Sequence, residues 1–251
     1  MTSRISASLP IGYTNAPPLR TIDGDDLVAS PTHELVRRKS TGLLQQFLVI
    51  AESADTQASV LRFSKKWGLL QLCRHGLPAW HSLRRPCAAA DSVQGYKKFA
   101  VSLDAMLRIG LELNNRRCGT RTDWQLANEG LSPPDFEPWS DDDREVFQGC
   151  LPLARSHFQV LMRRLTCVAD LTVRFYWKDQ GWGIDFDCSH GSNLAALMVI
   201  QLMATLSRPS VKKCLNCPRW FQPKGRQVYC VVCGRKASWR AASARYRNSR
   251  S

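Results

Sequence analysis

The sequence lacks any apolar run near the roughly 18 residues that a membrane-spanning helix needs. Its longest apolar stretch is Leu194–Leu206, which is too short to cross a bilayer. The first residues, Met1–Tyr13, carry one arginine and no long apolar core, so no secretory signal is indicated. Both absences argue against a membrane partner and predict a cytoplasmic protein whose cysteines are reduced.

The familiar catalytic motifs are also absent, because the sequence has no phosphate-binding loop, GxGxxG, HExxH or GxSxG pattern. The loop that carries Cys73, His75, His81 and Cys87 fits no standard set of metal ligands, so we expect an ordinary packed loop there. Two further groups are interpreted as structural rather than catalytic or ligand-binding. They are the hairpin-end residues Asp185, Asp187 and His190, and the tryptophans Trp124, Trp139, Trp177 and Trp182.

Acidic residues are missing from the C-terminal part of the chain, where Asp187 is the last one. The whole chain of 251 residues has 35 basic and 21 acidic side chains, and a net charge of +14. Residues 208–251 hold 12 of the basic residues and no acid, which leaves 23 basic and 21 acidic residues before them. This asymmetry predicts a segment that binds an anion, nucleic acid first. The alternative is a solvated basic face.

The composition of the whole chain is typical of a globular protein, with 44% hydrophobic and 22% charged residues. Residues 1–33 are rich in Pro, Ser and Thr and predict an irregular arm with one or two short strands. Apolar spacing predicts helices over 34–52 and 193–206. Three further helices are expected to begin at caps: one at Asp55, one at Asp91 that ends near residue 115, and one at Ser140 that ends near residue 167 and bends at Pro152. Alternation over 171–187 predicts a β-hairpin.

The sharpest pattern is two Cys-x-x-Cys pairs separated by 12 residues: Cys214, Cys217, Cys230 and Cys233. Four thiolates suit a tetrahedral zinc ion, and they leave no open position for a catalytic water. The sequence therefore predicts one structural Zn²⁺, with disulfides or a redox pair as the alternatives. The other six cysteines are scattered and are interpreted as buried, inert thiols.

The residues around these cysteines predict a small basic module. Trp220, Phe221 and Tyr229 are expected to form its miniature core, and an Ala- and Arg-rich helix is expected over 235–247, with Trp239 and Tyr246 packing on the module. A basic helix on a zinc module can enter a major groove or bind phosphates. The candidate nucleic-acid contacts are Lys212, Lys213, Arg219, Lys224, Arg226, Arg235, Lys236, Arg240, Arg245 and Arg247.

The pattern Cys214…Cys217-Pro-Arg-Trp-Phe221, Tyr229-Cys230…Cys233-Gly234, followed by an Arg-rich helix that ends Ala244-Arg245-Tyr246-Arg247, resembles the CGNR-type zinc finger of bacterial proteins. The family's Cys-Gly-Asn-Arg signature is Cys-Gly-Arg-Lys in this chain, and its second cysteine pair usually has a gap of four residues instead of two. The resemblance implies a zinc finger behind a mostly helical domain, in a bacterial DNA-binding regulator.

The sequence therefore predicts a mainly α protein with a small β-hairpin. It divides into an arm (1–33), a mostly helical domain (34–207) and a four-cysteine zinc finger with a basic C-terminal helix (208–251). The expected function is non-enzymatic nucleic-acid binding, to DNA rather than RNA, in a transcriptional regulator that could form a homodimer or take a small-molecule effector. The alternatives are a protein-interaction module whose basic tail meets an acidic protein, and, more weakly, an enzyme with its site in the loop 73–87.

Overall fold

The structure is a computed structural model. It describes the backbone of residues 13–16, 19–23, 26–29, 36–39, 42–70, 72, 91–131, 149–168, 171–178, 181–188, 194–207, 211–217, 219–221, 223 and 225–248. Side chains are described for 42–70, 72, 91–130, 149–166, 194–207, 211–217, 219–221, 223 and 225–239. The predicted cap at Ser140, the Cys73–Cys87 loop, and the side chains of Asp185, Asp187, Trp139, Trp177 and Trp182 lie outside these ranges.

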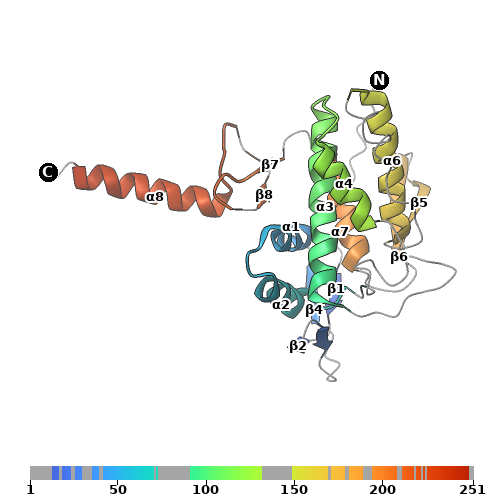
Figure 1. Ribbon diagram of the computed structural model, residues 1–251, viewed down its shortest axis with the longest axis horizontal. Coiled ribbons are helices and arrows are strands. Elements are labelled where there is room, and N and C mark those ends of the chain that lie inside the picture. The colour runs from blue at the N-terminus through green and yellow to red at the C-terminus, as the bar shows by residue number, and fades with distance from the viewer. Residues whose placement is uncertain are drawn as a thin grey trace.

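The described part of the chain is mostly helical, as the sequence predicts, and it is arranged around one long central helix, α3 (Val93–Asn114) (Figure 1). Helices α4, α6 and α7 pack against α3, as do α1, α2 and a 3₁₀ turn. The last helix, α8, extends away from this body toward the C-terminus. The bounds are α1 Leu43–Leu48, the 3₁₀ turn Val49–Glu52, α2 Thr56–Trp67, α4 Arg121–Leu131, α6 Leu151–Val168, α7 Leu194–Leu206 and α8 Val231–Asn248.

Within the described ranges, the strands form four two-stranded antiparallel pairs. The predicted hairpin is confirmed: β5 (Leu171–Lys178) pairs with β6 (Gly181–Cys188) along their whole length. The segment predicted to be an irregular arm contributes β1 (Tyr13–Ala16), β2 (Leu19–Asp23) and β3 (Asp26–Ala29). The pairs β2–β3 and β1–β4 (Val36–Lys39) are joined by backbone hydrogen bonds. A fourth pair, β7 (Lys212–Lys213) with β8 (Trp220–Phe221), belongs to the cysteine module.

The core lies on the apolar stripe of α3, which the sequence predicts. Tyr96, Phe99, Leu103, Met106 and Leu107 are all fully buried along this stripe. Helix α7 is buried on most of its sides, as expected for so apolar a segment. The helical body thus has one continuous hydrophobic core, and α3 runs through it.

The caps of two helices explain where the chain turns. Asp55 caps α2 as predicted, because its carboxylate accepts a hydrogen bond of 2.9 Å from the Ala58 N–H. The prediction that Asp91 caps α3 is wrong, because Ser92 holds that position and accepts from the Gly95 N–H. Asp91 is buried and instead accepts the Leu72 N–H at 3.0 Å, so it ties the preceding segment to the start of α3.

Three other predictions need correction. The helix expected over 34–52 forms only from Leu43, since Val36–Lys39 is a strand whose backbone is paired with β1. Pro152 bends no helix: it lies in the first turn of α6, where its missing N–H needs no partner. Among the described scattered cysteines, Cys150 is exposed rather than buried, because it lies outside the core just before α6.

Candidate metal centre

The four cysteines of the predicted zinc module come together in space. Cys214 follows β7, Cys217 lies in the turn that leads to β8, Cys230 precedes α8, and Cys233 is in the first turn of α8. Their sulfur atoms all lie within 4.8 Å of one another. The sequence thus identified a four-sulfur cluster that the fold assembles from both ends of the 12-residue gap.

The geometry of this cluster fits a metal ion. Four sulfurs at about 2.3 Å from a tetrahedral zinc ion lie about 3.8 Å from one another. The sulfurs of Cys217 and Cys230 are 3.7 Å apart, close to that edge length. Cys214, Cys230 and Cys233 are buried and Cys217 is half-buried, so the candidate site is largely shielded from solvent.

Surrounding polar groups point at the sulfurs. The Cys230 N–H donates to the Cys214 sulfur at 3.3 Å, and the Asn216 side-chain amide donates to the Cys233 sulfur at 3.6 Å. Each Cys-x-x-Cys pair forms one knuckle, Cys214–Cys217 the first and Cys230–Cys233 the second. Two backbone hydrogen bonds fix the first knuckle, from the Cys214 N–H to the Arg219 carbonyl and from the Leu215 N–H to the Val228 carbonyl. Such donors stabilise thiolates and orient the ligands of a metal.

Two thiols of the cluster, those of Cys214 and Cys217, have strongly separated pKa values. Burial raises the pKa of Cys214, but the N–H groups of Cys230 and Asn216 lower it, and the net result is a pKa lowered to about 6. Burial is the main reason that the pKa of Cys217 is raised to about 12, and the sulfurs of Cys233 and Cys214 add to the rise. Cys214 therefore becomes a thiolate at a lower pH than Cys217. A divalent cation would favour the charged form of all four sulfurs.

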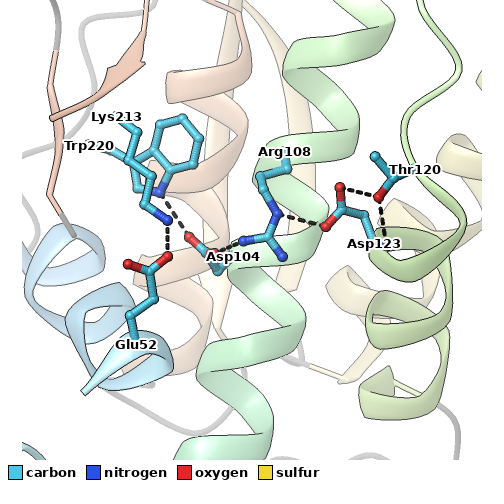
Figure 2. Close-up of polar contacts among 7 residues, drawn as sticks. All are labelled: Glu52, Asp104, Arg108, Thr120, Asp123, Lys213 and Trp220. Atoms are coloured by element: carbon cyan, nitrogen blue, oxygen red, sulfur yellow. Dashed lines mark hydrogen bonds and ion pairs between the residues drawn. The ribbon is translucent and has the colours of Figure 1, made fainter. Parts of the chain in front are cut away.

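The module is fastened to the helical body through Trp220. This side chain is only 8% exposed and belongs to the hydrophobic core of the body, not to a separate core of the module. Its indole N–H donates a hydrogen bond of 2.8 Å to the carboxylate of Asp104 on α3 (Figure 2). The predicted miniature core is therefore wrong for Trp220, and it is wrong for Tyr229, which is 38% exposed. Of the three residues predicted to form that core, Phe221 is the one that packs against the cysteines.

Asp104 is the first member of a chain of polar contacts that runs across α3 to α4 (Figure 2). It forms an ion pair with Arg108, whose guanidinium also donates to Asp123 at 2.7 Å. Asp123 in turn accepts from the Thr120 hydroxyl at 2.8 Å, at the start of α4. Burial raises the pKa of Asp104, and this outweighs the lowering by Trp220 and Arg108. A carboxylate that is costly to bury depends on these two partners.

A second contact between module and body involves Lys213. Its ammonium forms an ion pair with Glu52 at the end of the 3₁₀ turn, and it lies 5.7 Å from the centre of the Trp220 ring. Burial lowers the pKa of Lys213. Of the predicted nucleic-acid contacts, Lys213 is therefore engaged with the body, beside the Trp220 anchor.

The other predicted nucleic-acid contacts fall into two groups. Five are exposed on the surface of the module: Lys212, Arg219, Arg226, Arg235 and Lys236. For the remaining four, no side chain is described, although the backbone of Arg240, Arg245 and Arg247 is helical within α8 and Lys224 lies between described residues. The predicted basic helix is confirmed, and it begins at Val231, four residues earlier than expected. The predicted packing of Trp239 on the module is wrong, because this side chain is 79% exposed.

Sequence reasoning missed Asp104 and Glu52 as partners of the module. One signal for Asp104 was present: it is an acid on the apolar stripe of α3, beside Leu103 and four residues before Arg108. An acid in such a place needs a buried partner. Glu52 gave no comparable signal, because its pairing with Lys213 joins residues 161 positions apart.

No family model matches the chain, and neither the curated proteins nor the solved structures contain a significant match. None of the helices within the described ranges combines the length and apolarity that crossing a membrane requires. The function must therefore be inferred from the chemistry of the site itself.

Proposed function

We propose that the C-terminal module is a zinc-stabilised nucleic-acid-binding element, in a DNA-binding protein of the regulator type. One observation carries the proposal. The five described cations Lys212, Arg219, Arg226, Arg235 and Lys236 are exposed, and residues 208–251 contain no acid that could neutralise them. An uncompensated cluster of this kind binds the phosphate backbone by releasing counterions.

The position of α8 supports the same proposal. The helix leaves the cysteine cluster and extends away from the helical body (Figure 1), so most of its length lies apart from that body. A zinc ion bound by Cys214, Cys217, Cys230 and Cys233 would fix the first turn of this helix relative to the knuckle. The metal would supply structure and no catalysis, because all four ligands are protein sulfurs. The resemblance to CGNR-type zinc fingers implies the same arrangement.

The salt dependence of binding tests the proposal. In the zinc-loaded full chain, Arg235→Gln together with Lys236→Gln removes two exposed cations from α8. We expect weaker binding to a DNA duplex and a slope of log K against log salt that is shallower by roughly 2, since each phosphate contact contributes about 0.9. Fluorescence anisotropy over a salt series measures both quantities.

The matched control removes two exposed cations from the helical body, Arg155→Gln with Arg163→Gln on α6. This pair changes the net charge by the same amount, so its slope should stay at the wild-type value. Equal losses in the two double variants would contradict the proposal, because the net charge and not the module would then govern binding.

A further inference from the structure

Exposed apolar side chains are concentrated on the cysteine module. Of the large hydrophobic side chains that the structure describes as exposed, Val160 alone lies on the helical body. The others are Leu215, Val228, Tyr229, Val231, Val232 and Trp239. Large aromatic side chains left in water next to cations indicate a binding surface rather than a folding element.

Several of these side chains line one open hollow of about 600 Å³ between the second knuckle and the first turns of α8. Tyr229 and Val231 border it together with Trp239 from the next turns of the helix. Gly234 adds no side chain to its wall, and a Cβ there would only touch the Tyr229 Cβ at 3.9 Å. The hollow therefore offers a flat, exposed indole and open space beside it.

The cations Arg226 and Arg235 border the same hollow, and no carboxylate is present in the module. Its occupant must accordingly combine negative charge with a flat apolar face. A second copy of the chain is disfavoured, because it would bring two uncompensated sets of 12 basic residues together. Acidic peptides supply the charge but no regular series of flat faces. A nucleic-acid strand supplies both, because each nucleotide carries one flat base and one negatively charged phosphate.

We propose that this hollow binds unpaired bases of a single nucleic-acid strand, with a base stacked on Trp239 and the adjacent phosphates contacted by Arg226 and Arg235. In a duplex the faces of the bases are covered by their neighbours, so stacking on an exposed indole requires an unpaired strand. This inference rests on the proposed nucleic-acid function and adds the form of nucleic acid that the module prefers.

The test compares two labelled probes on the zinc-loaded full chain: oligothymidylate, which has little structure of its own, and a duplex of the same length. Trp239→Ala should weaken binding of oligothymidylate by about ten-fold, the effect typical of losing one stacked base, and leave duplex binding unchanged. Trp239→Phe keeps an aromatic face and should recover most of the affinity. Leu215→Ala removes an apolar side chain that is 75% exposed and does not line the hollow, so it should change neither affinity.

Two outcomes would overturn the inference while leaving the proposed function intact. In one outcome, Arg235→Gln with Lys236→Gln weakens duplex binding, but Trp239→Ala leaves oligothymidylate binding unchanged. The other is an equal loss for both probes in Trp239→Ala. If the wild-type chain binds neither probe even at low salt, the proposed function itself fails and this inference fails with it.

Discussion

Replacing Trp220 with alanine should destabilise the zinc-loaded protein by about 3–5 kcal/mol, the range for truncating a buried tryptophan. The residue belongs by sequence to the cysteine module, but its ring fills the core of the helical body and is only 8% exposed. Its loss would open a cavity beside α3 and remove one of the two hydrogen-bonding partners of the buried Asp104 carboxylate. Equilibrium denaturation of the full chain measures the effect.

Two further variants separate packing from the hydrogen bond. Trp220→Phe keeps most of the apolar volume but cannot donate to Asp104, so an intermediate loss of about 1.5–3 kcal/mol is expected, the value of a bond to a charged group. Trp239→Ala truncates a tryptophan of the same module that is 79% exposed, and it should change stability by less than about 0.5 kcal/mol. Similar losses for Trp220→Ala and Trp239→Ala would show that Trp220 does not anchor the module.

Replacing a single cysteine of the cluster, Cys217→Ser, should abolish stoichiometric zinc binding and unfold the knuckles. Structural zinc contributes about 10–16 kcal/mol of apparent binding energy in zinc-finger peptides, far more than the short strands β7 and β8 can supply. Metal analysis after gel filtration should find one zinc per chain in the wild type and none in the variant. Hydrogen exchange should rise most across residues 212–230 and less in α3 and α7, which share the hydrophobic core of the helical body.

The matched control is Cys150→Ser, which replaces an exposed cysteine outside the cluster. This chain should retain one zinc ion and normal protection of the knuckles. Full zinc retention in Cys217→Ser, or loss of zinc in Cys150→Ser, would contradict the assignment of the metal to the four clustered sulfurs.

These two predictions are linked by the position of Trp220 within the 12-residue gap between the cysteine pairs. The metal would hold the two ends of this segment together, and the indole ring holds its middle against α3. Loss of zinc should therefore also weaken the docking of Trp220, and the metal would stabilise both the module and its attachment to the helical body.

Local patterns explain why so much of the site could be predicted. The spacing of the cysteines indicates that four sulfurs can reach one ion, and the structure brings these four sulfurs together. In the same way, alternation over 171–187 specified the β5–β6 hairpin, and the apolar stripe of α3 specified the face that is buried. These features depend on residues that are near neighbours in the sequence, so the chain itself carries the information.

Several of the errors concern contacts between distant segments. Whether Trp220 is buried depends on its partner Asp104 on α3, which is 116 residues away in the sequence. Aromatic content alone cannot show such a contact. The helix predicted from residue 34 failed for a similar reason, because the pairing of β4 with β1 overrides a local helical spacing. The sequence predicts that Tyr229 belongs to a small core and that Trp239 packs on the module, whereas the module packs through Trp220 and leaves these two rings at the surface.

The most direct test of the account is nucleic-acid binding by one preparation before and after its metal is removed by a chelator. Removing the metal should abolish binding at moderate salt. Zinc, but not magnesium, should restore it, because four thiolates suit zinc and not a hard cation. Binding that is equally tight in the metal-free chain would contradict the claim that the four-cysteine centre builds the nucleic-acid-binding surface.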